Sequence, residues 1–147
     1  MLGQDISPHA LNAARANAAR AGLADKIEWK LSDISDAQPP SATPGLLITN
    51  PPYGERLGDE AEIIKLYSLL GIALKERFAG WRAAVFTARP DLTPRIGLRA
   101  VNLHSFYNGA IPCKLLRFEI SAGTPDGSGG ADFANRLGKN LKHLAQW

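Results

Sequence analysis

Residues 46–54, with the sequence Leu-Leu-Ile-Thr-Asn-Pro-Pro-Tyr-Gly, constrain the fold of this chain more than any other segment. The run at residues 46–49 is too short for a helix but long enough for a buried strand. The two prolines behind it fit neither a helix interior nor a central strand, and they hold Asn50 outside the helical region. The sequence therefore predicts a buried strand that ends abruptly in a stiff turn.

The stiff turn carries groups suited to the methylation of a planar exocyclic amine. The Asn50 side-chain oxygen and the Pro51 carbonyl can accept the two N–H bonds of such an amine, and the Tyr53 ring can stack on the base. The alternative is a proline-rich turn that only caps a core strand. We take the first interpretation, with Asn50, Pro51, Pro52 and Tyr53 as the candidate catalytic residues.

Composition limits the class of protein and the kinds of site. A length of 147 residues with 45% hydrophobic content suits one globular domain, and a net charge of +3 permits a nucleic-acid partner without requiring one. The single cysteine, Cys113, excludes an internal disulfide and a cysteine-based zinc site, which fits a cytoplasmic location. The three histidines lack the spacing of metal ligands. We therefore expect no metal. Because the sequence shows neither a membrane-spanning apolar run nor a secretion leader, we also expect no membrane partner.

Strand and helix patterns alternate along the chain. The predicted strands are residues 1–5, 26–31, 46–49 and 83–88. The predicted helices are residues 8–21 and a segment that runs from the acidic residues 59–62 to Gly80. Residues 90–96 are predicted as a short helical segment and residues 101–120 as a hairpin. Ser7 and Pro8 provide the start of the first helix, and Asn108 with Gly109 provides the hairpin turn. Such alternation is typical of an α/β fold with a largely parallel sheet, which the hairpin makes mixed.

The last part of the chain differs in composition. Residues 121–130 are rich in Gly, Ser, Thr, Pro and Asp and are predicted to be a linker, which leaves residues 1–120 as the main domain. Residues 131–147 have the periodicity of an amphipathic helix. This helix can dock on the domain, begin another domain or present basic charge to RNA, and its periodicity does not choose among these.

Polar residues follow three successive predicted strands: Asp5, Asp33 and Asn50. Ligands of open α/β sheets bind beyond the carboxyl ends of the strands. Carboxylates at such ends can bond the ribose hydroxyls and the exocyclic amine of an adenosine, while Ile6 and Ile34 flank its ring. A single Asp at a strand end is more often a helix cap or a turn residue. The order of the three residues favours a cofactor-binding rim, formed by Asp5, Ile6, Asp33, Ile34 and Asn50.

Several other residues have simpler explanations. Glu55 and Arg56 are close enough to the turn to contact a substrate phosphate or to orient the loop, although a surface ion pair explains them equally well. We expect Trp29 and Trp81 in the core and Tyr107 in the packing of the hairpin.

Three motifs resemble those of one known family: Asp-Ile-Ser at residues 5–7, Ser-Asp at residues 32–33 and, above all, Thr-Asn-Pro-Pro-Tyr-Gly-Glu-Arg-Leu at residues 49–57. The chain resembles the class I S-adenosylmethionine-dependent methyltransferases, specifically the bacterial large-subunit ribosomal RNA guanine-N2 methyltransferases, often labelled N6-adenine-specific DNA methylases. The resemblance covers about the first 120 residues. Residues 132–142 resemble the start of the second, guanine-N7 module of fused double methyltransferases, except that Gly138 stands where a basic residue is expected.

This resemblance implies a Rossmann-like sheet and methyl transfer from S-adenosylmethionine to guanine N2 in 23S ribosomal RNA. It implies that Asp5 binds the ribose, that Asp33 binds the adenine, and that the residues from Asn50 to Tyr53 provide catalysis and base stacking. The implied substrate-binding residues are Tyr53, Glu55 and Arg56.

One part of the family pattern is missing. The first strand of the family and its glycine-rich loop would lie ahead of Met1, so we expect an incomplete sheet with unpaired strand edges and weak or no donor binding. Other functions stay open, because the same turn serves enzymes that methylate adenine N6 in DNA or a glutamine amide in a protein. The chain can also be a non-catalytic remnant or an interaction domain.

Overall fold

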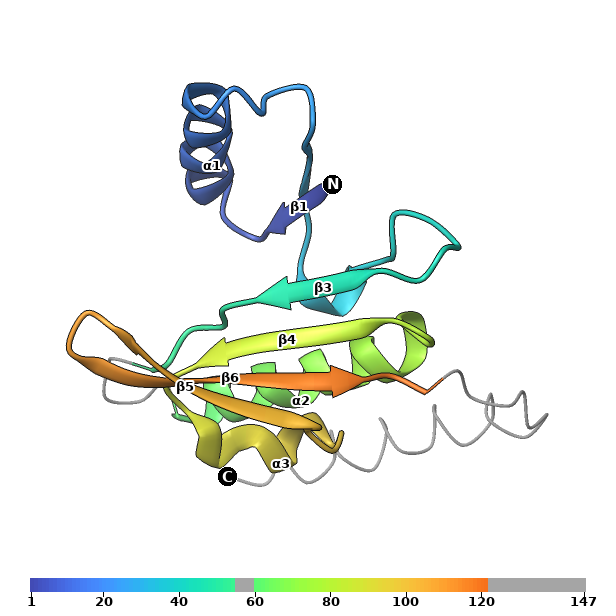
Figure 1. The fold of residues 1–147 in the computed structure, drawn as a ribbon, viewed down its shortest axis with the longest axis vertical. Helices are drawn as coiled ribbons and strands as arrows, with labels where there is room; N and C mark the ends of the chain where they lie inside the picture. Colours follow the sequence, from blue (N-terminus) through green and yellow to red (C-terminus); the bar gives the residue numbers. More distant parts are fainter. Residues whose placement is uncertain (55–59, 122–147) are drawn as a thin grey trace.

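The computed structural model describes residues 1–54 and 60–121, and these residues form two β-sheets (Figure 1). In the first sheet, β1 (Leu2–Asp5) pairs in parallel with β2 (Glu28–Leu31). In the second sheet, the strand order is β3-β4-β6-β5. The predicted α/β class is confirmed, but the described strands are divided between two sheets, because β1 and β3 are not hydrogen-bonded to each other.

Helix α1 (Pro8–Arg20) connects the two strands of the first sheet. It begins as predicted, because the Ser7 hydroxyl accepts a hydrogen bond from the Ala10 amide at 3.3 Å and a proline occupies the first turn. It ends before Gly22, whose φ of 70° is one that glycine adopts readily. The residues that it buries are Leu11 and Ala18.

The second sheet is mixed. β3 (Leu46–Thr49) runs parallel to β4 (Arg82–Thr87), whereas β6 (Ile111–Glu119) runs antiparallel to both β4 and β5 (Asn102–Asn108). The predicted hairpin is therefore confirmed, and Gly109 in its turn has a φ of 61°.

Helix α2 (Glu60–Arg77) covers one face of the second sheet, and the turn η2 (Pro90–Leu92) and the short helix α3 (Thr93–Ile96) lie beside it (Figure 1). A Cβ atom added to Gly71 of α2 would lie 2.0 Å from the Ile96 carbonyl oxygen, so glycine allows α2 and α3 to approach this closely. The largest fully buried side chains of this core are Tyr67, Leu74, Val85, Thr87, Ile96, Leu116 and Phe118.

Strand β3 lies at a sheet edge, which corrects the prediction that it is buried. The side chains of Leu46 and Ile48 are 52% and 69% exposed. Only β4 pairs with β3 in the described part of the chain. A parallel strand is buried when neighbours cover both its edges and both its faces, and here one edge has no neighbouring strand.

The structure confirms some of the predictions for aromatic side chains and corrects others. Tyr107 is 75% exposed, so the prediction that it packs in the hairpin is wrong. It lies next to the hairpin tip, which projects beyond the end of β4 (Figure 1) and leaves the ring little to pack against. Trp81 is buried, as predicted, whereas Trp29 is only half-buried, because it belongs to the small first sheet.

Some predictions concern residues that are not described. The predicted helix at residues 131–147 and nearly all of the predicted linker at residues 121–130 lie outside the described residues. Within the part of the chain that is described, no helix is long and apolar enough to cross a membrane. The same residues contain no group of three acidic, histidine or cysteine side chains placed to hold a metal ion.

Candidate functional site

A cavity of about 330 Å³ lies where β1, β2 and β3 end. It brings together the five residues that the sequence predicts as a cofactor-binding rim: Asp5, Ile6, Asp33, Ile34 and Asn50. Because β1 and β2 are parallel and β3 points the same way as β1 (Figure 1), the residues that follow these strands meet at one side of the molecule. The other residues that line the cavity are Gln4, Ser32, Thr49, Pro51, Pro52, Leu66 and Leu70.

Each of the two carboxylates in this cavity is held by a backbone amide of the turn that follows it. Asp5 Oδ1 accepts a hydrogen bond from the Ser7 amide, and Asp33 Oδ1 accepts one from the Ser35 amide, both at 2.7 Å. Asp33 thereby caps the turn η1 (Ile34–Asp36). The two simpler roles that the sequence also allowed are therefore present, a cap at Asp33 and a turn residue at Asp5, and they orient both carboxylates at the cavity.

The hydrogen bonds from Ser35 hold the pKa of Asp33 below its ordinary value, because they stabilise the carboxylate more than its burial disfavours it. The Lys65 ammonium acts in the same direction with a smaller effect. Asp33 is therefore ionised at neutral pH, and its oxygens only accept hydrogen bonds. Such a group suits the N–H or O–H donors of a ligand.

Apolar side chains complete the lining. Ile6 is 67% exposed, whereas Ile34 packs against the hydrophobic core of the second sheet. Leu66 and Leu70 come from α2, and Leu70 is buried. An apolar wall beside oriented carboxylates suits a flat ring that carries polar groups at its edge.

The turn after β3 is closed by a hydrogen bond between its own side chains. The Tyr53 hydroxyl donates to Asn50 Oδ1 at 2.7 Å, and the Cys113 thiol donates to that hydroxyl at 3.9 Å. Burial, with a smaller contribution from Cys113, raises the pKa of Tyr53, so the hydroxyl keeps its proton. Asn50 Oδ1, the atom predicted to accept an amine, thus already accepts one hydrogen bond from Tyr53 and has a second lone pair for a ligand.

A charged cluster at the end of β4 was not predicted from the sequence. The Arg89 guanidinium donates to the two carboxylate oxygens of Glu60 at 2.9 and 2.8 Å, and to the Asp91 carboxylate at 3.0, 3.2 and 2.8 Å. These bonds lower the pKa of Glu60 and of Asp91 and raise that of Arg89. Glu60 begins α2, so the cluster ties this helix to the end of β4. The signal for it was the position of Arg89 directly after a predicted strand.

Cys113 was also missed as a neighbour of the turn. It is buried on β6, opposite Phe106 of β5, and only the register of these strands brings it to Tyr53. No local sequence pattern could have shown this. Glu55 and Arg56, predicted to bind substrate, lie outside the described residues.

Residues 1–117 match the protein family described as "RMKL-like, methyltransferase domain". A curated relative from Allochromatium vinosum, named Ribosomal RNA large subunit methyltransferase K/L, is 46% identical over 160 residues. The match covers 100% of this chain and 22% of the relative, so the chain spans about a fifth of the length of that protein.

Two solved structures are similar in fold and sequence. A possible methylase from Clostridium difficile 630 has a TM-score of 0.75 and 30% identity, over 84% of this chain and 32% of that one. The protein SMU.472, solved in complex with SAH, has a TM-score of 0.75 and 29% identity, again over 84% of this chain and 32% of that one. These findings confirm the Rossmann-like fold class and the resemblance that the motifs indicated. The chain belongs to the RMKL-like methyltransferase domain family.

Proposed function

We propose that this domain binds S-adenosylmethionine and serves methyl transfer to the exocyclic N2 amine of a guanine in 23S ribosomal RNA. The cavity at the strand ends carries the proposal, because it groups two oriented carboxylates, two isoleucines and Asn50 in one place. The family match and the SAH held by the related protein SMU.472 support it.

The lining of the cavity suits the adenosine end of S-adenosylmethionine. We assign Asp5 to the ribose hydroxyls and Asp33 to the adenine amine, because carboxylate oxygens accept hydrogen bonds and these ligand groups donate them. Ile6 and Ile34 then flank the adenine ring. When bound, S-adenosylmethionine supplies an electrophilic methyl group.

The turn after β3 holds the acceptor amine. The Asn50 side-chain oxygen and the Pro51 carbonyl accept its two N–H bonds, which leaves the nitrogen lone pair free to attack. Asn50 Oδ1 accepts the amine with the lone pair that the Tyr53 hydroxyl does not use, and the Tyr53 ring stacks on the guanine. Pro52 keeps the turn stiff. The nitrogen gains the methyl group as the methyl–sulfur bond of the donor breaks, which leaves S-adenosylhomocysteine. The methylated nitrogen then releases its surplus proton to water, so no side chain with a pKa near neutrality is required.

Glu55 and Arg56 complete the proposed substrate-binding set. Both directly follow the turn in sequence, and an arginine at this point suits a phosphate of the RNA backbone. The other acceptors of the same chemistry, adenine N6 in DNA and a glutamine amide, present comparable N–H groups to the turn. The experiment must therefore identify the methylated product.

Mass spectrometry of nucleosides from 23S ribosomal RNA tests the proposal. Cells that lack the gene should lose N2-methylguanosine at the target position, and the wild-type gene should restore it. Asn50→Ala should fail to restore it, whereas Asn102→Ala, at an exposed asparagine on β5, should restore it fully. Unchanged N2-methylguanosine in cells without the gene would refute the guanine assignment. A loss of N6-methyladenine from DNA instead would establish the alternative acceptor.

A further inference from the structure

The outer part of the β5–β6 hairpin lies beside the turn that holds the proposed acceptor amine. This part, which we call the hairpin end (residues 105–114), projects beyond the end of β4 on the side where β3 also ends (Figure 1). Cys113, which pairs with Phe106, has its thiol 3.9 Å from the Tyr53 hydroxyl. Burial raises the pKa of Tyr53, and the Asn108 side chain opposes this shift, so Asn108 is also close to that hydroxyl. The hairpin end therefore borders the place proposed for the target base.

The hairpin end carries exposed aromatic rings. Among the aromatic side chains of the described residues, only Phe106 and Tyr107 are exposed, at 47% and 75%. Tyr107 therefore contributes little to the packing of the hairpin. An exposed aromatic ring is a platform on which a nucleic-acid base can stack, and any of the bases can do so.

The segment that contains the hairpin carries the excess positive charge of the chain. Residues 92–118 hold four of the 17 lysine and arginine residues and none of the 14 acidic residues. The segment thus has a charge of +4, and the rest of the chain has a charge of −1. None of its four basic side chains forms an ion pair with a carboxylate of the described residues: Arg95, Arg99, Lys114 and Arg117. Positive charge of this kind beside exposed rings suits a nucleic acid.

Lys114 brings one of these charges next to Tyr107. Its ammonium group donates a hydrogen bond to Ser105 Oγ at 2.7 Å. Ser105 and Tyr107 are two residues apart on β5, so their side chains leave the same face of the sheet about 7 Å from each other. A nucleotide whose base stacks on Tyr107 would therefore have its phosphate within reach of Lys114.

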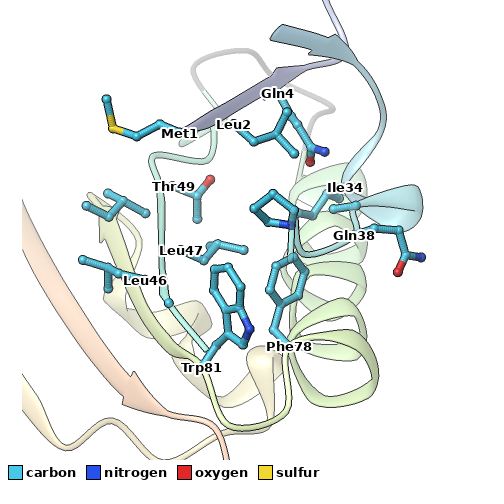
Figure 2. Close-up of a pocket in the computed structure, with 14 residues that line it drawn as sticks. Met1, Leu2, Gln4, Ile34, Gln38, Leu46, Leu47, Thr49, Phe78 and Trp81 are labelled. Carbon is cyan, nitrogen blue, oxygen red and sulfur yellow. The ribbon is translucent and has the colours of Figure 1, made fainter. Parts of the chain in front are cut away.

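A second cavity, between β1 and β3, offers no such charge (Figure 2). It has a volume of about 460 Å³, and no Asp, Glu, Lys or Arg side chain lines it. Much of its lining is apolar, including Leu46, Leu47, Phe78 and Trp81. Phosphates find no counter-charge in this lining, so we expect a strand of RNA that reaches Asn50 to run over the hairpin end instead.

We propose that the hairpin end binds the single-stranded stretch of RNA next to the target guanine, with a base stacked on Tyr107 and a phosphate bound by Lys114. This proposal rests on the proposed function, because it takes RNA as the substrate. A guanine that enters the turn after β3 has to leave the stack of its neighbours, and proteins read RNA mostly in such unstacked, single-stranded stretches. Tyr107 holds the neighbouring base and so presents the guanine to Asn50 and Tyr53.

Photo-crosslinking with the full chain tests where the RNA lies. The probe is a single-stranded RNA of about 12 nucleotides with 4-thiouridine beside its only guanine. Trypsin cleaves after Arg99 and Lys114, so the hairpin end is released within one peptide, residues 100–114. Mass spectrometry should find the RNA adduct on this peptide. Adducts on other peptides alone would overturn the proposal.

Variants at two exposed positions of β5 test the stacking. Tyr107→Ala should weaken binding of the same RNA about tenfold in fluorescence anisotropy, because it removes the ring. Tyr107→Phe keeps the ring and should bind as the wild type does. Leu103→Ala, at a 58% exposed leucine farther from the hairpin turn, should also leave binding unchanged. Equal weakening by Tyr107→Ala and Leu103→Ala, or no saturable binding by the wild type, would overturn the proposal.

Salt dependence tests the contact with a phosphate. Lys114→Ala should reduce the slope of log affinity against log salt concentration by about 0.7, the value for one phosphate contact on a single strand. Lys30→Ala removes the same charge from an exposed position on β2 and should leave the slope unchanged. Equal changes in the two slopes would overturn the assignment of Lys114, because they would reflect general attraction alone.

Methylation in cells separates this proposal from the proposed function. In cells that lack the gene, Tyr107→Ala should restore less N2-methylguanosine than Tyr107→Phe does. Equal restoration, together with unchanged RNA binding, would overturn the contact and leave guanine methylation standing. If cells without the gene keep their N2-methylguanosine while the hairpin end still crosslinks to RNA, the proposed function fails and the contact stands. A preference of about tenfold for single-stranded DNA of the same sequence would overturn the choice of RNA.

Discussion

The proposed site has two halves, which lie on parts of the molecule that differ in how many buried residues they contain. The sheet body consists of β3, β4, β5 and β6 with α2, η2 and α3. It contains most of the 14 buried residues that form a hydrophobic core among the described residues, and none of these 14 comes from β1, α1 or β2. The N-terminal unit, consisting of β1, α1 and β2, buries only Leu11 and Ala18. Asn50 therefore follows a strand of a well-packed body, whereas Asp5 belongs to a unit with few buried contacts.

The turn η1 connects these two parts. Ala37, which follows it, lies in the core, and the Arg77 guanidinium at the end of α2 donates to the carbonyls of Ser35 and Ala37. Asp33, which caps η1, is thereby tied to the sheet body although it follows β2. Loosening of the N-terminal unit should therefore displace Asp5 while leaving Asp33 and Asn50 in place.

The largest expected effect comes from truncating a buried leucine in the sheet body. Leu74 is fully buried, and Leu74→Ala should lower the free energy of unfolding by about 2–5 kcal/mol, because it removes apolar contacts and leaves a cavity. Leu11→Ala is the matched change in α1, where the leucine is also buried. It should increase proteolysis within α1 and leave the urea midpoint of the sheet body unchanged. Equal losses of global stability from both variants would contradict the difference in packing between the sheet body and the N-terminal unit.

A somewhat smaller effect is expected from adding one methyl group between helices. In Gly71→Ala the new Cβ meets the Ile96 backbone at 2.0 Å, so α3 must shift, and we expect a loss of about 1–3 kcal/mol despite the better helix propensity of alanine. In Gly3→Ala the new Cβ meets the Trp29 ring at 2.5 Å, but this half-buried ring can rotate. Thermal unfolding followed by circular dichroism should rank Gly71→Ala as the more damaging change. The reverse ranking would contradict the tighter packing of the sheet body.

A buried hydrogen bond gives the next effect. The Tyr67 hydroxyl bonds Thr87 Oγ1, which also accepts a hydrogen bond from the Arg89 amide at 2.8 Å. Tyr67→Phe should therefore cost about 0.5–1.5 kcal/mol by calorimetry. Tyr107→Phe, at an exposed tyrosine, should change stability by less than about 0.5 kcal/mol. If both changes were neutral, the bond to Thr87 would contribute nothing to the sheet body.

The smallest effect is a pH dependence at Asp33. Its pKa is lower in the folded chain than the ordinary value of 3.8, so the carboxylate stabilises the fold above that value, and this contribution is lost as the pH falls through the folded pKa. Asp33→Asn should therefore be less stable than the wild type at neutral pH, and the difference should disappear in acid. Urea unfolding at several pH values measures it. A difference that does not vary with pH would show that Asp33 does not contribute through its charge.

Local signals predicted those features that depend on a few neighbouring residues. The start of α1 at Ser7 and the hairpin turn at Gly109 follow from capping and turn chemistry, which act within a few residues. The meeting of Asp33 and Asn50 followed from a general rule, since parallel strands end at the same side. Their roles toward a ligand stay predictions.

The features that sequence did not predict depend on contacts between distant segments. The exposure of Ile48 depends on whether a strand lies beside β3, and the sequence of β3 alone does not show whether one does. The bond between Cys113 and Tyr53 depends on the register of β6, and the ion pair between Arg89 and Glu60 depends on where α2 starts relative to β4. Periodicity and turn residues carry no information about such pairs.

Amide hydrogen exchange of the full chain, followed by mass spectrometry, tests most directly whether the two halves of the site differ in stability. We predict that the amides of β4 and β6 exchange slowest and that those of β1 and β2 exchange much faster, because the N-terminal unit opens without unfolding the sheet body. The amides of η1 should be protected more than those of β2. Equal protection of β1, β2, β4 and β6 would contradict the division of the site between a self-supporting body and a weakly supported unit.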